Sequence, residues 1–155
     1  MTGTPAMNQP KIKVFNSEPY RNLISGLTEH MDGKEFERAC NDIVIDILVN
    51  YEGFEKVEKG PPHSGAPFDF FGFKGEKPYL IEFKGSLSYF HTPGETEKRR
   101  IQELLRRIKG LKIALLQVKL KVSQYRIFYD EQMNLLFEGA KRPLDPVEKW
   151  IKSRL

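Results

Sequence analysis

The sequence predicts an α/β fold in which helices flank a mixed β-sheet, within a single domain of residues 1–155. Three observations support this fold class. A segment with helical spacing of apolar residues precedes a group of β-rich runs, two of these runs are joined by a short turn, and more β-rich runs follow a second helical segment. With 39% hydrophobic and 30% charged residues, the composition is that of an ordinary globular protein.

The first fifty residues are predicted to be mainly helical. Residues 1–10 are expected to form a flexible tail, and residues 11–15 an extended segment. Residues 19–30 carry apolar side chains at helical spacing, which predicts a short helix. An N-capping pattern at residues 32–35 then predicts a longer helix that ends near Asn50.

Three β-rich runs follow this helix. Residues 54–59 predict a strand and residues 60–66 a loop. The next two runs, residues 67–71 and 79–84, are separated by turn residues at positions 75–78. This spacing predicts two adjacent antiparallel strands.

The second half of the chain begins with a helix. Residues 92–95 resemble a capping box with Pro93 at the first helical position, and apolar residues mark a buried face before Gly110. The remaining predicted elements are strands at 112–119 and 124–129, an edge strand at 134–137, and a final helix capped by Asp145.

Three polar residues interrupt the two central hydrophobic runs, namely Asp69, Glu82 and Lys84. Strand side chains alternate between faces, so Glu82 and Lys84 project from the same face, together with Leu80. Antiparallel pairing brings Asp69 beside Glu82. Carboxylates about 4 Å apart repel by roughly 4 kcal/mol at an effective dielectric near 20, so the pair predicts a bound cation. Mg²⁺ suits carboxylate ligands and also binds substrate phosphates.

Asp69, Glu82 and Lys84 resemble the signature of the PD-(D/E)XK nuclease superfamily, although one residue is inserted between Pro67 and Asp69. The resemblance extends over residues 33–129 and is greatest to archaeal-type Holliday-junction resolvases. It implies a restriction-endonuclease-like fold and a Mg²⁺-dependent endonuclease that hydrolyses DNA, with Mn²⁺ as a substitute metal. In that family the acids bind the metal and the lysine assists the attacking water.

The resemblance also implies a further acid on the preceding helix. Glu37 lies along the boundary of the apolar helical face, whereas Glu35 lies on the polar face and belongs to the predicted capping box, so we favour Glu37. The main-chain carbonyl of Phe83 is a further candidate metal ligand. Ser64 and His63, in the loop before Asp69, are candidates for contacting phosphate.

A basic segment follows the predicted acidic site. Residues 95–126 contain ten basic and three acidic residues, a net charge of +7, which predicts a surface that binds a polyanion. The candidate contacts to the DNA backbone are Arg99, Arg100, Arg106 and Arg107. Glu103 offers Arg107 an intrahelical partner instead. Tyr89, Phe90 and His91 are either base-stacking residues or core residues.

A chain with one such site needs a second copy to cut both strands, so a homodimer is expected. The sequence has no apolar stretch long enough for a membrane span, and its single cysteine, Cys40, lies in an apolar helical stripe, which fits a reducing cytoplasm. Two alternatives stay open. The protein could be an inactive nucleic-acid-binding module on a nuclease-like scaffold, or a subunit that docks to other proteins.

Overall fold

The computed structural model describes residues 10–28, 31, 33–61, 68–129 and 145–155. Within these residues, six strands form one mixed sheet in the order β1-β6-β5-β4-β3-β2. The strands are β1 (Lys13–Val14), β2 (Glu55–Lys59), β3 (Phe70–Lys74), β4 (Lys77–Ser86), β5 (Lys112–Lys119) and β6 (Gln124–Tyr129). The mixed α/β class predicted from the sequence is therefore confirmed.

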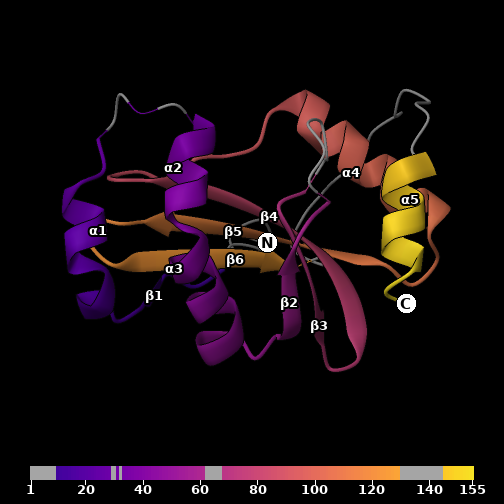
Figure 1. Ribbon diagram of the computed structural model, residues 1–155, viewed down its shortest axis with the longest axis horizontal. Coiled ribbons are helices and arrows are strands. Elements are labelled where there is room, and N and C mark those ends of the chain that lie inside the picture. The colour runs from indigo at the N-terminus through magenta and orange to yellow at the C-terminus, as the bar shows by residue number, and fades with distance from the viewer. Residues whose placement is uncertain (1–9, 29–30, 32, 62–67, 130–144) are drawn as a thin grey trace, which may run out of the picture.

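The helical elements lie on both sides of this sheet (Figure 1). They are the 3₁₀ turn η2 (Glu18–Tyr20), α1 (Arg21–Ser25), α2 (Gly33–Ala39), α3 (Asn41–Asp46), the π-helical turn η3 (Ile47–Tyr51), α4 (Glu95–Arg107) and α5 (Asp145–Lys152). Strands β4 and β5 are parallel, and α4 connects them, as parallel neighbours require a crossover. The other strand pairs are antiparallel.

Side chains of β4 alternate between two hydrophobic cores, as its sequence predicts. Tyr79, Ile81 and Phe83 belong to a core that includes residues of α2 and α3. Leu80 belongs to the other core, with Leu104 of α4 and Ile151 of α5. The central strand is thus buried on both faces, and this burial fixes its register and the directions of its polar side chains.

A tight turn joins β3 to β4. Gly75 and Glu76 both have positive φ angles, +57° and +68°, which are the angles of a two-residue type I′ hairpin turn. The predicted turn at residues 75–78 was too wide, because Lys77 and Pro78 already pair with β3. Strand β4 also runs two residues beyond the predicted end at Lys84.

Two predicted helices differ from the structure. The expected helix to Asn50 is divided into α2, α3 and η3, with a non-helical Cys40 (φ −92°, ψ 2°) between α2 and α3. Helix α4 begins at Glu95, because the carboxylate of Glu97 accepts the main-chain N–H of Gly94 at 3.2 Å. The predicted start at Pro93 was therefore wrong by two residues.

Other predicted elements of the N-terminal part are present but shorter than predicted. The extended segment contains β1, which pairs with β6. In place of the helix predicted at residues 19–30, η2 begins one residue earlier and α1 ends at Ser25. Residues 1–9 of the tail predicted at 1–10, the cap residue Asp32 and the predicted edge strand at 134–137 lie outside the described residues.

A buried carboxylate ties three strands to the helical segment. Glu52 follows η3, and its side chain is only 2% exposed. Its oxygens accept hydrogen bonds from Lys13 of β1 (2.8 Å) and from Tyr125 (2.6 Å) and Tyr129 (2.8 Å) of β6, and Lys74 of β3 lies 3.8 Å away. Burial alone would raise the pKa of Glu52, but these hydrogen bonds lower it below its usual value.

Cys40 is fully buried, as expected, and burial raises the pKa of its thiol to about 12. None of the helices in the described part of the chain has the length and apolar character needed to cross a membrane.

Candidate active site

The site lies where β3 stops pairing with β4. The β3 ladder begins at Phe70, opposite Ile81, and Asp69 immediately precedes it. The N–H of Asp69 still donates to the carbonyl of Ile81 at 3.0 Å. Beyond this point β4 continues without pairing to β3. The side chain of Asp69 replaces the missing main-chain partner, since its Oδ2 accepts the N–H of Phe83 at 2.8 Å. The carboxylate of Asp69 is thereby fixed against the edge of β4.

This hydrogen bond also orients the main chain of β4. The N–H and C=O of a strand residue point toward the same neighbouring strand. Since the N–H of Phe83 points to Asp69, the Phe83 carbonyl projects toward the same side of β4. The main-chain oxygen that the sequence predicted as a ligand therefore faces the gap that β3 leaves.

Glu82 is the most buried acid of the site, with 3% of its surface exposed. Its Oε2 is buried and has no hydrogen-bond partner among the described residues. Burial, together with the neighbouring carboxyl groups of Asp69 and Glu97, raises the pKa of Glu82 well above its usual value. A buried carboxyl group of this kind is stabilised either by a proton or by a bound cation.

Lys84 supplies the positive charge of the cluster. Its Nζ lies 3.0 Å from Oε2 of Glu97 and 4.0 Å from Oε2 of Glu37, and its side chain is 11% exposed. Burial lowers the pKa of this ammonium, but the charges of Glu82, Glu97 and Glu37 outweigh burial and raise it above the usual value. Lys84 is therefore a cation throughout the physiological pH range.

Glu37 reaches the same place from α2, with its Oε2 4.0 Å from Nζ of Lys84. Of the two helix acids considered, Glu37 is the one whose carboxylate lies near Lys84, whereas Glu35 is exposed. Burial, and then the charge of Asp69, raises the pKa of Glu37 to about 7. Its charge consequently changes within the physiological pH range.

Glu97 belongs to this cluster, although the sequence analysis did not assign it to the site. It lies in the first turn of α4, and one carboxylate oxygen contacts Lys84 while the other accepts the N–H of Gly94. Burial raises the pKa of Glu97, but interactions with Glu82, Lys84 and Gly94 outweigh it and lower the pKa. The pKa of Glu82 moves in the opposite direction, because Glu82 is the more deeply buried of the two acids.

The sequence signal for Glu97 was its position three residues after the cap Gly94, which is a helix-start pattern. That pattern predicts a structural acid. Only the crossover from β4 to α4 brings the same carboxylate back to Lys84.

The oxygen atoms of this cluster are of the kind that bind a divalent cation. Among the described residues, no group of three or more His, Cys, Asp or Glu side chains is gathered closely enough to hold a metal ion. The available oxygen atoms are nevertheless of the type that a hard cation prefers. They are the unpartnered buried oxygen of Glu82, the carboxyl group of Asp69 beside it, and the main-chain carbonyl of Phe83 on the same side of β4. A cation there would offset the mutual repulsion of these acids.

The four predicted arginines of α4 are not equivalent. Arg106 and Arg107 contact Glu103 at 3.5 and 3.3 Å, and Arg107 also contacts Glu148 of α5 at 3.1 Å. The intrahelical pairing considered for Arg107 is thus present. Arg99 is exposed, and Arg100 is half-buried and has interactions of its own. Part of the positive charge of this helix is neutralised by its own acids.

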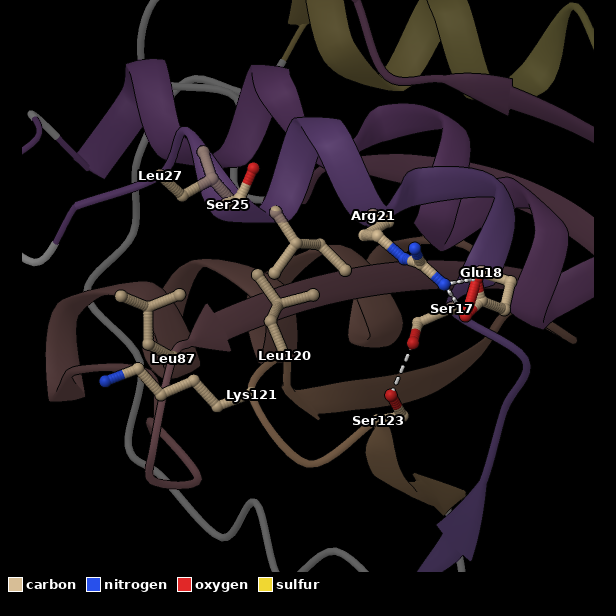
Figure 2. Close-up of a pocket in the computed structure, with 10 residues that line it drawn as sticks. Ser17, Glu18, Arg21, Ser25, Leu27, Leu87, Leu120, Lys121 and Ser123 are labelled. Carbon is tan, nitrogen blue, oxygen red and sulfur yellow. Dashed lines mark hydrogen bonds and ion pairs between the residues drawn. The ribbon is translucent and has the colours of Figure 1, made fainter.

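Ser64 and His63, the two loop candidates, lie outside the described residues. A pocket of about 370 Å³ lies elsewhere, between η2 and α1 on one side and the segments that follow β4 and β5 on the other (Figure 2). In it Glu18 holds the guanidinium of Arg21, and Ser17 and Ser123 share a hydrogen bond. Its lining includes none of the four acids that gather at the end of β4.

No protein-family model matches the chain, and no curated protein matches its sequence significantly. The interpretation of this site therefore depends on its residues and their geometry. Four carboxyl groups and one ammonium from three separate elements, together with the segment that precedes β3, meet at one end of β4.

Proposed function

We propose that this protein is a metal-dependent endonuclease that hydrolyses phosphodiester bonds in DNA, and that its sheet is of the restriction-endonuclease-like type. The observation that supports this most is the convergence of Asp69, Glu82 and Lys84 at one place, where Glu82 keeps an unpartnered buried oxygen. Perturbed acids that surround a single lysine are typical of a catalytic site rather than of a surface ion pair.

Within this proposal, Asp69, Glu82 and the carbonyl of Phe83 would hold Mg²⁺, with Mn²⁺ as a substitute, and Glu37 would complete or tune the site. The metal supplies Lewis-acid polarisation of a phosphoryl oxygen and makes water a better nucleophile at neutral pH. Glu82 would bind the metal as a carboxylate, and the charge of a bound cation would favour that ionised form.

Lys84 acts as a cation beside the reacting phosphate. Its pKa is raised, so it does not serve as a base; it orients the attacking water and stabilises the negative charge that develops on the phosphoryl oxygens. Glu97 and Glu37 hold the ammonium in place before substrate binds. Arginine would not replace it, because the planar guanidinium fits a different geometry.

The proposal is tested by a cleavage screen. The full-length protein is incubated with supercoiled plasmid, single-stranded DNA, branched DNA and RNA, in Mg²⁺, in Mn²⁺ and in EDTA, with Glu82→Ala as the blank. We expect metal-dependent cleavage of at least one DNA substrate and none with the variant, whose fold is checked by circular dichroism.

The alternatives predict different outcomes. An inactive nucleic-acid-binding module would show salt-dependent binding that Glu82→Ala leaves unchanged, with no cleavage in either metal. A protein-docking subunit would bind DNA no better than an acidic control protein. Sedimentation with and without DNA tests the proposed homodimer, and a monomer under both conditions argues against it.

A further inference from the structure

A second polar group lies on the same sheet face as the acidic cluster. Lys84 of β4, Gln117 of β5 and Arg126 of β6 are register partners and form one row across three neighbouring strands. Partners in adjacent strands project from the same face, so the three side chains share the face that carries Glu82. With strands about 4.8 Å apart, the backbone of Arg126 lies roughly 10 Å from that of Lys84.

Gln117 is a buried linker in this row. Its side chain is 0% exposed, its amide donates to the carbonyl of His91 at 2.7 Å, and its oxygen accepts the Nε–H of Arg126 at 2.6 Å. A buried amide with both ends engaged has a single orientation. Gln117 therefore fixes the guanidinium of Arg126 relative to the sheet.

Aromatic rings fix the same guanidinium from other directions. The guanidinium carbon lies 4.4 Å from the ring centre of Phe90 and 5.1 Å from that of Phe128. The ammonium of Lys119 lies 4.2 Å from the Phe90 ring centre. Phe90 is thus a shared contact of two cations, which lie next to each other on this face.

The guanidinium keeps its binding capacity. Only its Nε takes part in the hydrogen bond to Gln117, and among the described residues its terminal nitrogens have no partner and no carboxylate lies within ion-pair distance. This differs from Arg106 and Arg107, which acids of the chain neutralise. The guanidinium is planar and is held by the aromatic rings, and its terminal N–H groups can donate to two oxygens of a phosphate group.

We propose that Arg126 and Lys119, held by Gln117 and Phe90, form a second phosphate subsite for the nucleic-acid strand that Lys84 contacts. This inference rests on the proposed function and names how that site takes its substrate. The strand places one phosphate at the acidic cluster and a later phosphate of the same strand at Arg126. A contact to phosphate carries no sequence information, so we do not expect Arg126 and Lys119 to select a base sequence.

The test measures binding without cleavage. Fluorescence anisotropy of a labelled single-stranded DNA and of the same sequence as RNA is recorded in EDTA with the full-length protein over a range of salt concentrations. Arg126→Gln is compared with Lys109→Gln, which removes the same charge from an exposed residue two positions after the end of α4. We expect about tenfold weaker binding for Arg126→Gln and a salt slope smaller by about 0.7, as for one lost phosphate contact to a single strand.

Arg126→Lys provides a second measurement. It keeps the charge but lacks the planar fork and the Nε donor, so binding is expected to fall between that of the wild type and Arg126→Gln. If both Arg126 variants bind and respond to salt as Lys109→Gln does, the subsite is overturned. Because the assay needs no metal, a protein that shows the Arg126 effect but never cleaves DNA retains the subsite and loses the nuclease proposal.

Discussion

The ammonium of Lys84 lies 3.0 Å from Oε2 of Glu97, and Oε1 of the same carboxylate accepts the N–H of Gly94. One side chain thus fixes both the start of α4 and the amine at the centre of the acidic cluster. Because α4 carries five of the ten basic residues of segment 95–126, Glu97 couples the position of these charges to the proposed reaction centre.

Glu97→Gln is expected to separate these two roles. The amide oxygen still accepts the Gly94 N–H, so α4 keeps its cap, but Lys84 loses a charged partner. We expect DNA cleavage to fall roughly ten- to hundredfold, as for small misplacements of a catalytic group. The alkaline limb of the pH-rate profile should move to lower pH, because the pKa of Lys84 falls. Glu95→Gln, in the same turn and exposed, is the control; an unchanged profile for Glu97→Gln would remove its positioning role.

Lys84→Ala should abolish most activity while the fold persists. Loss of a preorganised cation at a developing charge costs roughly 100- to 1000-fold in rate, and DNA affinity in EDTA should change only a few-fold because other cations bind the backbone. Single-turnover cleavage and anisotropy measure the two effects. Lys77→Ala, at the exposed start of the same strand, is the control. Cleavage retained by Lys84→Ala would exclude the residue from the mechanism.

The metal-free protein should lose stability as pH rises from about 4.5 to about 7. The folded-state pKa of Glu37 is about 7, above its ordinary value of 4.5, so the folded state binds more protons than the unfolded state in this window. The stability contribution is complete below pH 4.5 and decreases as pH rises through 7, by about 1 to 3 kcal/mol after allowance for partial exposure.

Urea denaturation in EDTA at a series of pH values measures this decrease. Glu37→Gln should flatten the curve between pH 5 and 7, whereas Glu35→Gln, on the exposed side of α2, should leave it unchanged. Mg²⁺ should raise the midpoint most at high pH, where the acids are ionised. Identical curves for wild type and Glu37→Gln would contradict the assigned burial of Glu37.

Glu52→Ala is expected to destabilise the fold without affecting the site chemistry. It leaves the hydroxyls of Tyr125 and Tyr129 without their acceptor and removes the partner of Lys13, a loss of about 2 to 4 kcal/mol. Urea denaturation measures the loss, and cleavage per folded molecule should stay constant. Glu55→Ala, exposed on β2, should change stability by less than about 0.5 kcal/mol. A comparably small effect of Glu52→Ala would show that the network is not stabilising.

The sequence determined much of the local structure, because local patterns carry it. Apolar alternation placed Glu82 and Lys84 on one face of β4 and Tyr79, Ile81 and Phe83 on the other, and the two cores confirm this. The turn residues Gly75 and Glu76 closed the hairpin that brings Asp69 to Glu82. Helix spacing favoured Glu37 over Glu35. Each of these conclusions depends on residues that are neighbours in sequence or one hairpin apart.

The tertiary structure alone decided what depends on distant segments. It ended the β3 ladder at Phe70 and let the Asp69 carboxylate take the place of the missing strand, and it brought Glu97 back to Lys84 through a crossover. It also left Arg126 open while Glu103 occupied Arg106 and Arg107. Sequence shows that a charge is present, but only packing sets which charges are close enough to neutralise one another, because electrostatic energies depend on separation and burial.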